Sequence, residues 1–191
     1  MKFNFILPFL FFGVFTISAQ VKYEREFRIK KSDFPSKAFE LIESKLTNAK
    51  RIKYYKEIDS ATTSFEAKFK KDRLWYSIEF SEDGNLEDIE ITIKAIDLPN
   101  DSYENIQLYL KSNFSSYKIR KIQQQYVVEN SVVATLKNAF QNLMIPSVNY
   151  ELIVDGKKNK SYQEFEILFN AEGDFVSSRK SLPPNYDHVL Y

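Results

Sequence analysis

The sequence predicts an α+β fold built from two tandem units, each a helix packed against an antiparallel sheet. Many segments alternate apolar and polar residues with a period of two, which is typical of strands with one buried face and one solvent-exposed face. Other segments place apolar residues three and four positions apart, which predicts amphipathic helices. The order of segments also repeats, since Phe80 and Phe169 are 89 residues apart, as are Gly84 and Gly173.

The first unit is expected over residues 20–98. An alternating strand over residues 21–29 precedes a helix over residues 34–50, and Pro35 lies close to the first helical turn, where proline is favoured. Asp83-Gly84-Asn85 is a strong hairpin signal. Four more alternating strands are expected around residues 52–58, 65–69, 74–80 and 89–93.

The second unit is expected over residues 99–182, followed by a tail over residues 183–191. It resembles the first unit in order, with one additional helix over residues 131–143. The remaining elements are a helix over residues 101–114 and strands over 117–128, 148–154, 162–169 and 175–180. From the apolar positions we expect a core that includes Phe65, Phe69, Tyr76, Ile78, Phe80, Ile91, Leu136, Phe140, Phe165, Ile167 and Phe169.

Residues 1–19 have the pattern of a cleavable signal peptide. Lys2 precedes an apolar run over residues 3–17, and Ser18-Ala19 supplies small residues at a cleavage point. The alternative is a membrane anchor, but the run is shorter than the ~20 apolar residues that a spanning helix needs. We therefore expect a periplasmic or secreted protein that begins at Gln20 and does not insert into the membrane.

The composition argues against several classes of function. The chain has no cysteine, which excludes disulfides, thiolate metal sites and cysteine nucleophiles. His188 is the only histidine, so neither a catalytic triad nor a multi-histidine metal site is expected. The 27 basic and 26 acidic residues leave no overall field to attract nucleic acid. We expect no enzymatic activity, no cofactor, no metal and no nucleic-acid partner.

Two acidic features have plain structural interpretations. The carboxylates of Glu79 and Glu90 are expected to face each other on an exposed sheet face near lysines, where a raised pKa is not expected. The acidic stretch over residues 82–88 lacks the ligand spacing of a twelve-residue calcium loop and is interpreted as a hairpin turn.

Four motifs of the first unit form a set. They are Phe34-Pro35-x-x-Ala38, Ile52-Lys53-Tyr54-Tyr55-Lys56-Glu57, Phe65-Glu66-Ala67-Lys68-Phe69, and Trp75-Tyr76-Ser77-Ile78-Glu79-Phe80 followed by Asp83-Gly84. A cysteine-free exported chain with these motifs resembles the PepSY-like envelope proteins of Bacteroidetes, which are similar in fold to the beta-lactamase inhibitory protein. The resemblance implies tandem α+β units and binding or inhibition of another protein, and it carries no catalytic residues to this chain.

Strand alternation places Trp75 and Tyr55 on the sheet face away from the helix. Large aromatic residues among charges are typical of protein-binding surfaces, although the second unit or the tail could instead cover them. We expect a binding or inhibitory module acting on an unknown envelope or secreted protein. The alternative is a carrier of an apolar small ligand, given 17 Phe and 12 Tyr. The candidate binding residues are Lys53, Tyr55, Glu66, Lys68, Trp75 and Glu79.

Overall fold

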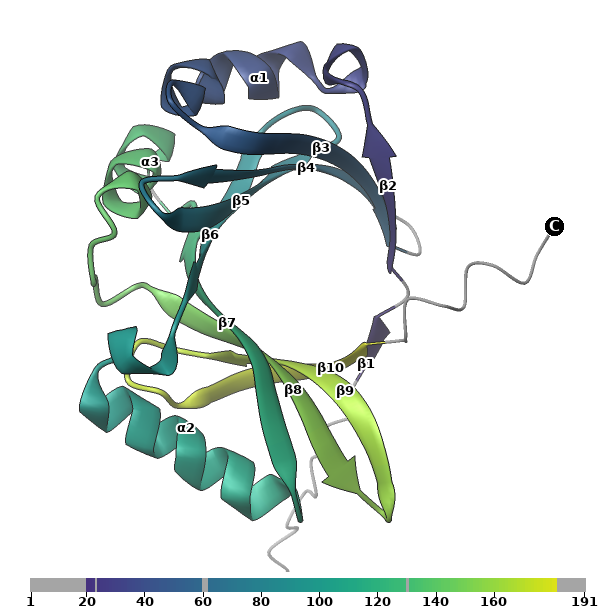
Figure 1. Cartoon of the computed structure of the whole chain (residues 1–191), viewed down its shortest axis with the longest axis vertical. Helices are drawn as coiled ribbons and strands as arrows, with labels where there is room; N and C mark the ends of the chain where they lie inside the picture. The colour runs from purple at the N-terminus through teal and green to yellow at the C-terminus, as the bar shows by residue number, and fades with distance from the viewer. Residues whose placement is uncertain (1–19, 23, 60–61, 130, 182–191) are drawn as a thin grey trace, which may run out of the picture.

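One ten-stranded sheet forms the body of the protein (Figure 1). The computed structural model describes residues 20–22, 24–59, 62–129 and 131–181, so the predicted signal peptide, His188 and the rest of the tail lie outside the described residues. The strand order is β1-β10-β9-β8-β7-β6-β5-β4-β3-β2. Neighbouring strands are antiparallel except β1 and β10, which are parallel. The strands are β1 (Gln20–Lys22), β2 (Glu24–Ile29), β3 (Lys50–Asp59), β4 (Thr62–Lys71), β5 (Leu74–Ser81), β6 (Leu86–Ile93), β7 (Tyr117–Val127), β8 (Asn149–Lys158), β9 (Ser161–Phe169) and β10 (Phe175–Ser181).

The described part of the chain forms three α-helices, which lie on the convex side of the curved sheet (Figure 1). They are α1 (Ser36–Ile42), α2 (Asn100–Asn113) and α3 (Val132–Phe140), accompanied by the short 3-10 helices η1 (Lys31–Asp33), η2 (Glu43–Leu46) and η3 (Ala95–Asp97). Among the described residues, no helix has the length and apolar character needed to cross a membrane.

The predicted helix over residues 34–50 is wrong in length. α1 ends at Ile42 and continues only as the 3-10 turn η2. Asn48 and Arg51 then take positive φ angles of 64° and 58°, and β3 already begins at Lys50. A left-handed residue cannot continue a right-handed helix, so the chain turns back to the sheet earlier than the apolar spacing predicts.

The predicted strand over residues 21–29 is divided between the two ends of the sheet. Its first part, β1, pairs with β10, while β2 pairs with β3. β1 and β2 follow each other in the sequence, but they form the two opposite edges of the sheet (Figure 1).

The order of a helix followed by four strands occurs twice. α1 precedes β3 to β6, and α2 precedes β7 to β10, with α3 inserted between β7 and β8. The two sets are not separate sheets, because β6 pairs with β7 over six residue pairs from Asp88↔Val127 to Ile93↔Ile122. That these sets are tandem repeats with the boundaries expected from the sequence stays a prediction.

The hydrophobic core lies between the convex face and the helices. Most of the predicted core residues are buried, whereas Phe65 and Phe140 are partly buried and pack against the core. Phe34, just before α1, meets Phe80 edge-on at 5.7 Å between ring centroids. The ring of Phe140 from α3 stacks on Tyr76 at 5.0 Å. Since the apolar side chains face the helices, the polar residues that alternate with them line the concave face.

Candidate functional site

The concave face of the sheet is the candidate site, because the described helices all pack on the other side (Figure 1). Directly opposite residues in paired strands point to the same face. Tyr55 lies opposite Glu66, and Glu66 lies opposite Glu79. In the neighbouring rows, Lys53 lies opposite Lys68, and Trp75 lies opposite the next polar residue of β4, Lys70.

All six residues singled out from the sequence therefore lie on this face, two each from β3, β4 and β5. They differ in exposure: Trp75 is 38% exposed, whereas Glu66 is 3% exposed. The Arg51 guanidinium lies 5.7 Å from the centre of the Trp75 ring, and the Lys70 ammonium lies 5.8 Å from it. The tryptophan is thus partly accessible and flanked by cations. The binding role of the six residues stays a prediction.

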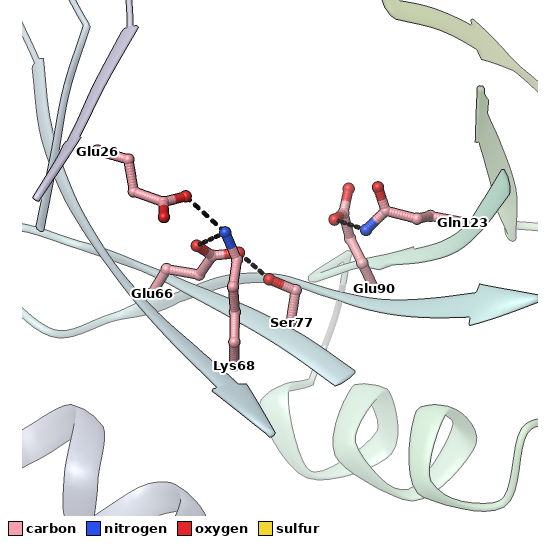
Figure 2. A network of polar contacts seen from close by, with 6 residues as sticks. All are labelled: Glu26, Glu66, Lys68, Ser77, Glu90 and Gln123. Carbon is pink, nitrogen blue, oxygen red and sulfur yellow. Dashed lines mark hydrogen bonds and ion pairs between the residues drawn. The ribbon is translucent and has the colours of Figure 1, made fainter. Parts of the chain in front are cut away.

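An ion-pair network surrounds Lys68 (Figure 2). Its Nζ lies 2.6 Å from Oε2 of Glu26 and 2.6 Å from Oε2 of Glu66. The hydroxyl of Ser77 donates to the other carboxylate oxygen of Glu66. The Lys68 ammonium also lies 4.8 Å from the centre of the Tyr55 ring. Strands β2, β3, β4 and β5 are thereby linked across the concave face.

Glu66 and its neighbour Glu57 are buried carboxyls that interact directly. Burial raises the pKa of Glu66 to about 8, an effect that the Lys68 ammonium partly offsets and that nearby Glu57 reinforces. Burial also raises the pKa of Glu57. Burial by itself would lower the pKa of Lys68, but Glu66 and Glu26 outweigh it and raise that pKa, so the lysine stays charged. Two adjacent buried carboxyls do not both ionise readily, because each charge disfavours the other.

A second group of buried carboxyls lies on β6. The expectation that Glu90 is exposed and has no raised pKa is wrong. Glu90 is only 8% exposed, and burial, followed by the charges of Glu151 and Asp88, raises its pKa well above the usual range. The side-chain amide of Gln123 donates to Glu90 (Figure 2). The physical reason is curvature: side chains on a concave face converge and exclude water from one another.

Asp88 is in the same group. Its Oδ2 accepts a 2.8 Å hydrogen bond from Gln125, while Oδ1 is buried without a hydrogen-bond partner among the described residues. Burial raises the pKa of Asp88 well above its usual value, and the charges of Glu79 and Glu151 add to this effect. The middle of the concave face is therefore acidic and poorly solvated.

Several residues of this face were not among the candidate binding residues chosen from the sequence. They carry the same strand parity as the predicted ones, which is the signal that could have identified them. Arg179 of β10 forms an ion pair with the buried Glu166 of β9, so the polar lining extends across the sheet. The residues not chosen are Glu26, Glu57, Ser77, Asp88, Gln123, Glu151, Glu166 and Arg179, together with Glu90, which was interpreted as an exposed carboxylate.

One group of carboxylates has oxygens close enough to hold a cation. Oxygen atoms of Glu26, Glu57 and Glu66 lie within 4.8 Å of one another. However, the Lys68 ammonium already bonds to two of these three side chains. Lys68 therefore already supplies a positive charge to this group of carboxyls.

Comparison with known proteins gives structural neighbours only. No protein-family model matches the sequence, and no curated protein matches it. The fold is similar to a DUF2874 family protein from Bacteroides ovatus (TM-score 0.54, 9% identity, covering 78% of this chain and 89% of that one). It is also similar to a candidate periplasmic protein from Bacteroides eggerthii (TM-score 0.53, 14% identity, 76% and 88% covered).

A BLIP-like protein from Bacteroides fragilis is a further neighbour, with a TM-score of 0.50 and 13% identity over 84% of this chain and 96% of that one. Identities this low show a shared fold and nothing finer. The resemblance predicted from the sequence, to exported proteins with a fold like that of the beta-lactamase inhibitory protein, is confirmed at the level of the fold.

Proposed function

We propose that this chain is an exported, non-enzymatic binding or inhibitory module that holds another envelope or secreted protein against the concave face of its sheet. The observation that carries the proposal is the partly exposed Trp75 on a sheet face that the described helices leave uncovered. Tryptophan is among the residues most enriched at the centres of protein interfaces. The periplasmic and BLIP-like descriptions of the structural neighbours support the same compartment and the same general role.

The charges of the face indicate what the partner presents. Near Trp75 the face is cationic, through Arg51 and Lys70. Towards β6 it is acidic, through Asp88 and Glu90, whose raised pKa values reflect burial among other carboxyls. A cationic side chain of the partner would favour the ionised form of these carboxyls, and complementary charges favour the correct partner over others. We therefore expect the partner segment to carry lysine or arginine where it meets β6.

The test compares two aromatic truncations. Trp75→Ala removes the proposed anchor, and Phe27→Ala removes an aromatic ring on the other face of the sheet that is 47% exposed. Each protein is used to capture partners from envelope extract, and affinity for the captured protein is then measured by titration. We expect Trp75→Ala to weaken binding by ~2 kcal/mol or more, about thirtyfold, while Phe27→Ala binds as the wild type does.

Melting curves separate a binding role from a structural one. Unchanged partner affinity together with a large fall in the melting temperature of Trp75→Ala would show that the tryptophan is structural and would remove the basis of the proposal. A lipid-like molecule that co-purifies in place of a protein partner would favour the carrier function instead.

A further inference from the structure

A hollow of about 680 Å³ lies where β2 ends and β3 begins, beside η1. Its lining combines cationic and apolar side chains from these three elements. The lining residues are Arg28, Ile29, Lys30, Lys31, Asp33, Ile52, Lys53 and Tyr54.

The backbone explains why the hollow is there. Ile29 and Tyr54 form the last residue pair between β2 and β3, after which the chain leaves the sheet through η1. On the other side, the register of β3 with β4 is interrupted between Lys50 and Lys53, where Arg51 has a φ of 58°. The turn and the irregular start of β3 diverge and leave space between them.

The hollow is strongly positive. It is lined by four cationic residues and one carboxylate, a formal charge of +3, whereas the whole chain has a formal net charge of +1. The carboxylate, Asp33, accepts a 3.0 Å hydrogen bond from Ser32, and the Lys31 ammonium lies 3.7 Å from the centre of the Phe39 ring.

The other three cations, Arg28, Lys30 and Lys53, form no side-chain hydrogen bond or ion pair with any residue that the structure describes. Lys68 behaves differently, since two carboxylates neutralise it. Three uncompensated cations around one hollow repel each other, and an anion placed among them would remove that repulsion.

We propose that this hollow binds a phosphate group, either as free phosphate or as the head group of a small amphiphile. The Arg28 guanidinium offers two parallel N–H donors, which match two phosphate oxygens, and the lysines supply further charge. Ile29 and Ile52 supply apolar lining for a chain attached to the phosphate. The site shares Lys53 with the candidate binding face, whereas Trp75 does not line the hollow.

The experiment titrates the protein with inorganic phosphate and, separately, with hexyl phosphate, followed by amide chemical shifts at low ionic strength. We expect saturable binding of both probes with a Kd of about 1 mM or tighter, with shifts centred on residues 28–33 and 52–54. Hexyl phosphate binding several times tighter than phosphate would identify an amphiphile head group as the ligand. Equal affinities would identify free phosphate.

Two charge-matched variants provide the control. Arg28→Gln/Lys53→Gln removes two cations from the hollow, and Lys157→Gln/Lys160→Gln removes two from the β8–β9 hairpin, which does not line it. We expect the first variant to bind phosphate at least about tenfold more weakly and the second to bind as the wild type does. Trp75→Ala should also bind phosphate normally.

Equal weakening in the two double variants would show unspecific attraction to positive charge and would overturn the proposal. Shifts that fail to saturate, or that spread over the whole surface, would do the same. Arg28, Lys53 and Lys160 are exposed and Lys157 is half-buried, so little change in melting temperature is expected. If the double variant nevertheless unfolds, Lys30→Gln alone is the replacement, and an affinity equal to that of the wild type would overturn the proposal.

Discussion

At the scale of single residues, the concave face is unusual for the number of carboxyls that it buries. Glu57, Glu66, Glu90 and Glu166 are each less than 10% exposed. Buried acidic groups reduce stability unless they are paired or protonated. Lys68 and Arg179 pair with two of them, and the remainder are partnered by amides or by other carboxyls. Perturbed carboxyls of this kind cluster at functional surfaces.

The raised pKa of Glu66 predicts how stability depends on pH. Its pKa rises from 4.5 to about 8 on folding, so between these values the folded state holds more protons than the unfolded state. The free energy of unfolding therefore falls as pH rises through this window. We expect Glu66→Gln to reduce this slope, by at most about 1.4 kcal/mol per pH unit, the limit for one proton.

The measurement is urea unfolding at several pH values between 5 and 8. Glu82→Gln, which changes an exposed turn residue, is the control and should keep the wild-type slope. A slope that is identical in Glu66→Gln and wild type would show that Glu66 ionises normally in the folded protein.

At the scale of elements, two hairpin turns are built alike. The N–H of Gly84 donates to Ser81 at 2.8 Å, and that of Gly173 donates to Asn170 at 3.0 Å. Both glycines have positive φ angles, 72° and 84°. Each turn packs against the beginning of the helix that precedes its set of strands, α1 for Gly84 and α2 for Gly173. This correspondence is what the proposed tandem repeat predicts.

The two glycines should nevertheless respond differently to substitution. A Cβ at Gly84 would lie 3.2 Å from the Ala38 nitrogen, whereas a Cβ at Gly173 would lie 2.2 Å from the carbonyl oxygen of Ser102. Gly84→Ala should cost about 1–2 kcal/mol from the left-handed conformation. Gly173→Ala should cost more, by a further ~1–3 kcal/mol of overpacking, because the backbone of α2 must move. Chemical denaturation of both variants checks this order, and equal losses would mean that α2 shifts without strain.

At the scale of the whole molecule, the N-terminal segment connects the two ends of the sheet. β1 lies beside β10, and β2 lies beside β3. Cleavage of the predicted signal peptide before Gln20 would leave β1 intact, since this strand begins at Gln20. The predicted cleavage would therefore remove no residue of β1.

The predicted cleavage point gives a direct test of export. Mass spectrometry of the protein recovered from the cell envelope or the medium should find a chain that begins at or near Gln20. Recovery of a chain that retains Met1 would contradict the predicted cleavage. A chain that begins after Lys22 would lack β1, leave β10 as an exposed edge, and favour edge-to-edge association.

The sequence by itself determined the strands, the faces they present and the turns between them. These features depend on local alternation, and shifting a strand such as β5 by one residue would bury Trp75 and expose Ile78. It also indicated the six candidate residues, because they share the parity opposite to the core. The sequence overestimated the length of α1, since no spacing rule anticipates the positive φ at Asn48.

Only the tertiary structure decided which side chains of the concave face are buried. The joining of both sets of strands into one sheet, and the position of β1 beside β10, depend on pairings between residues far apart in the chain. On this curved sheet Glu90 of β6 lies near Glu151 of β8 and Glu79 of β5. Both Glu66 and Glu90 are buried, although the sequence had placed them in solvent. Burial and pKa depend on how strands converge in space, and alternation along a single strand carries no information about that convergence.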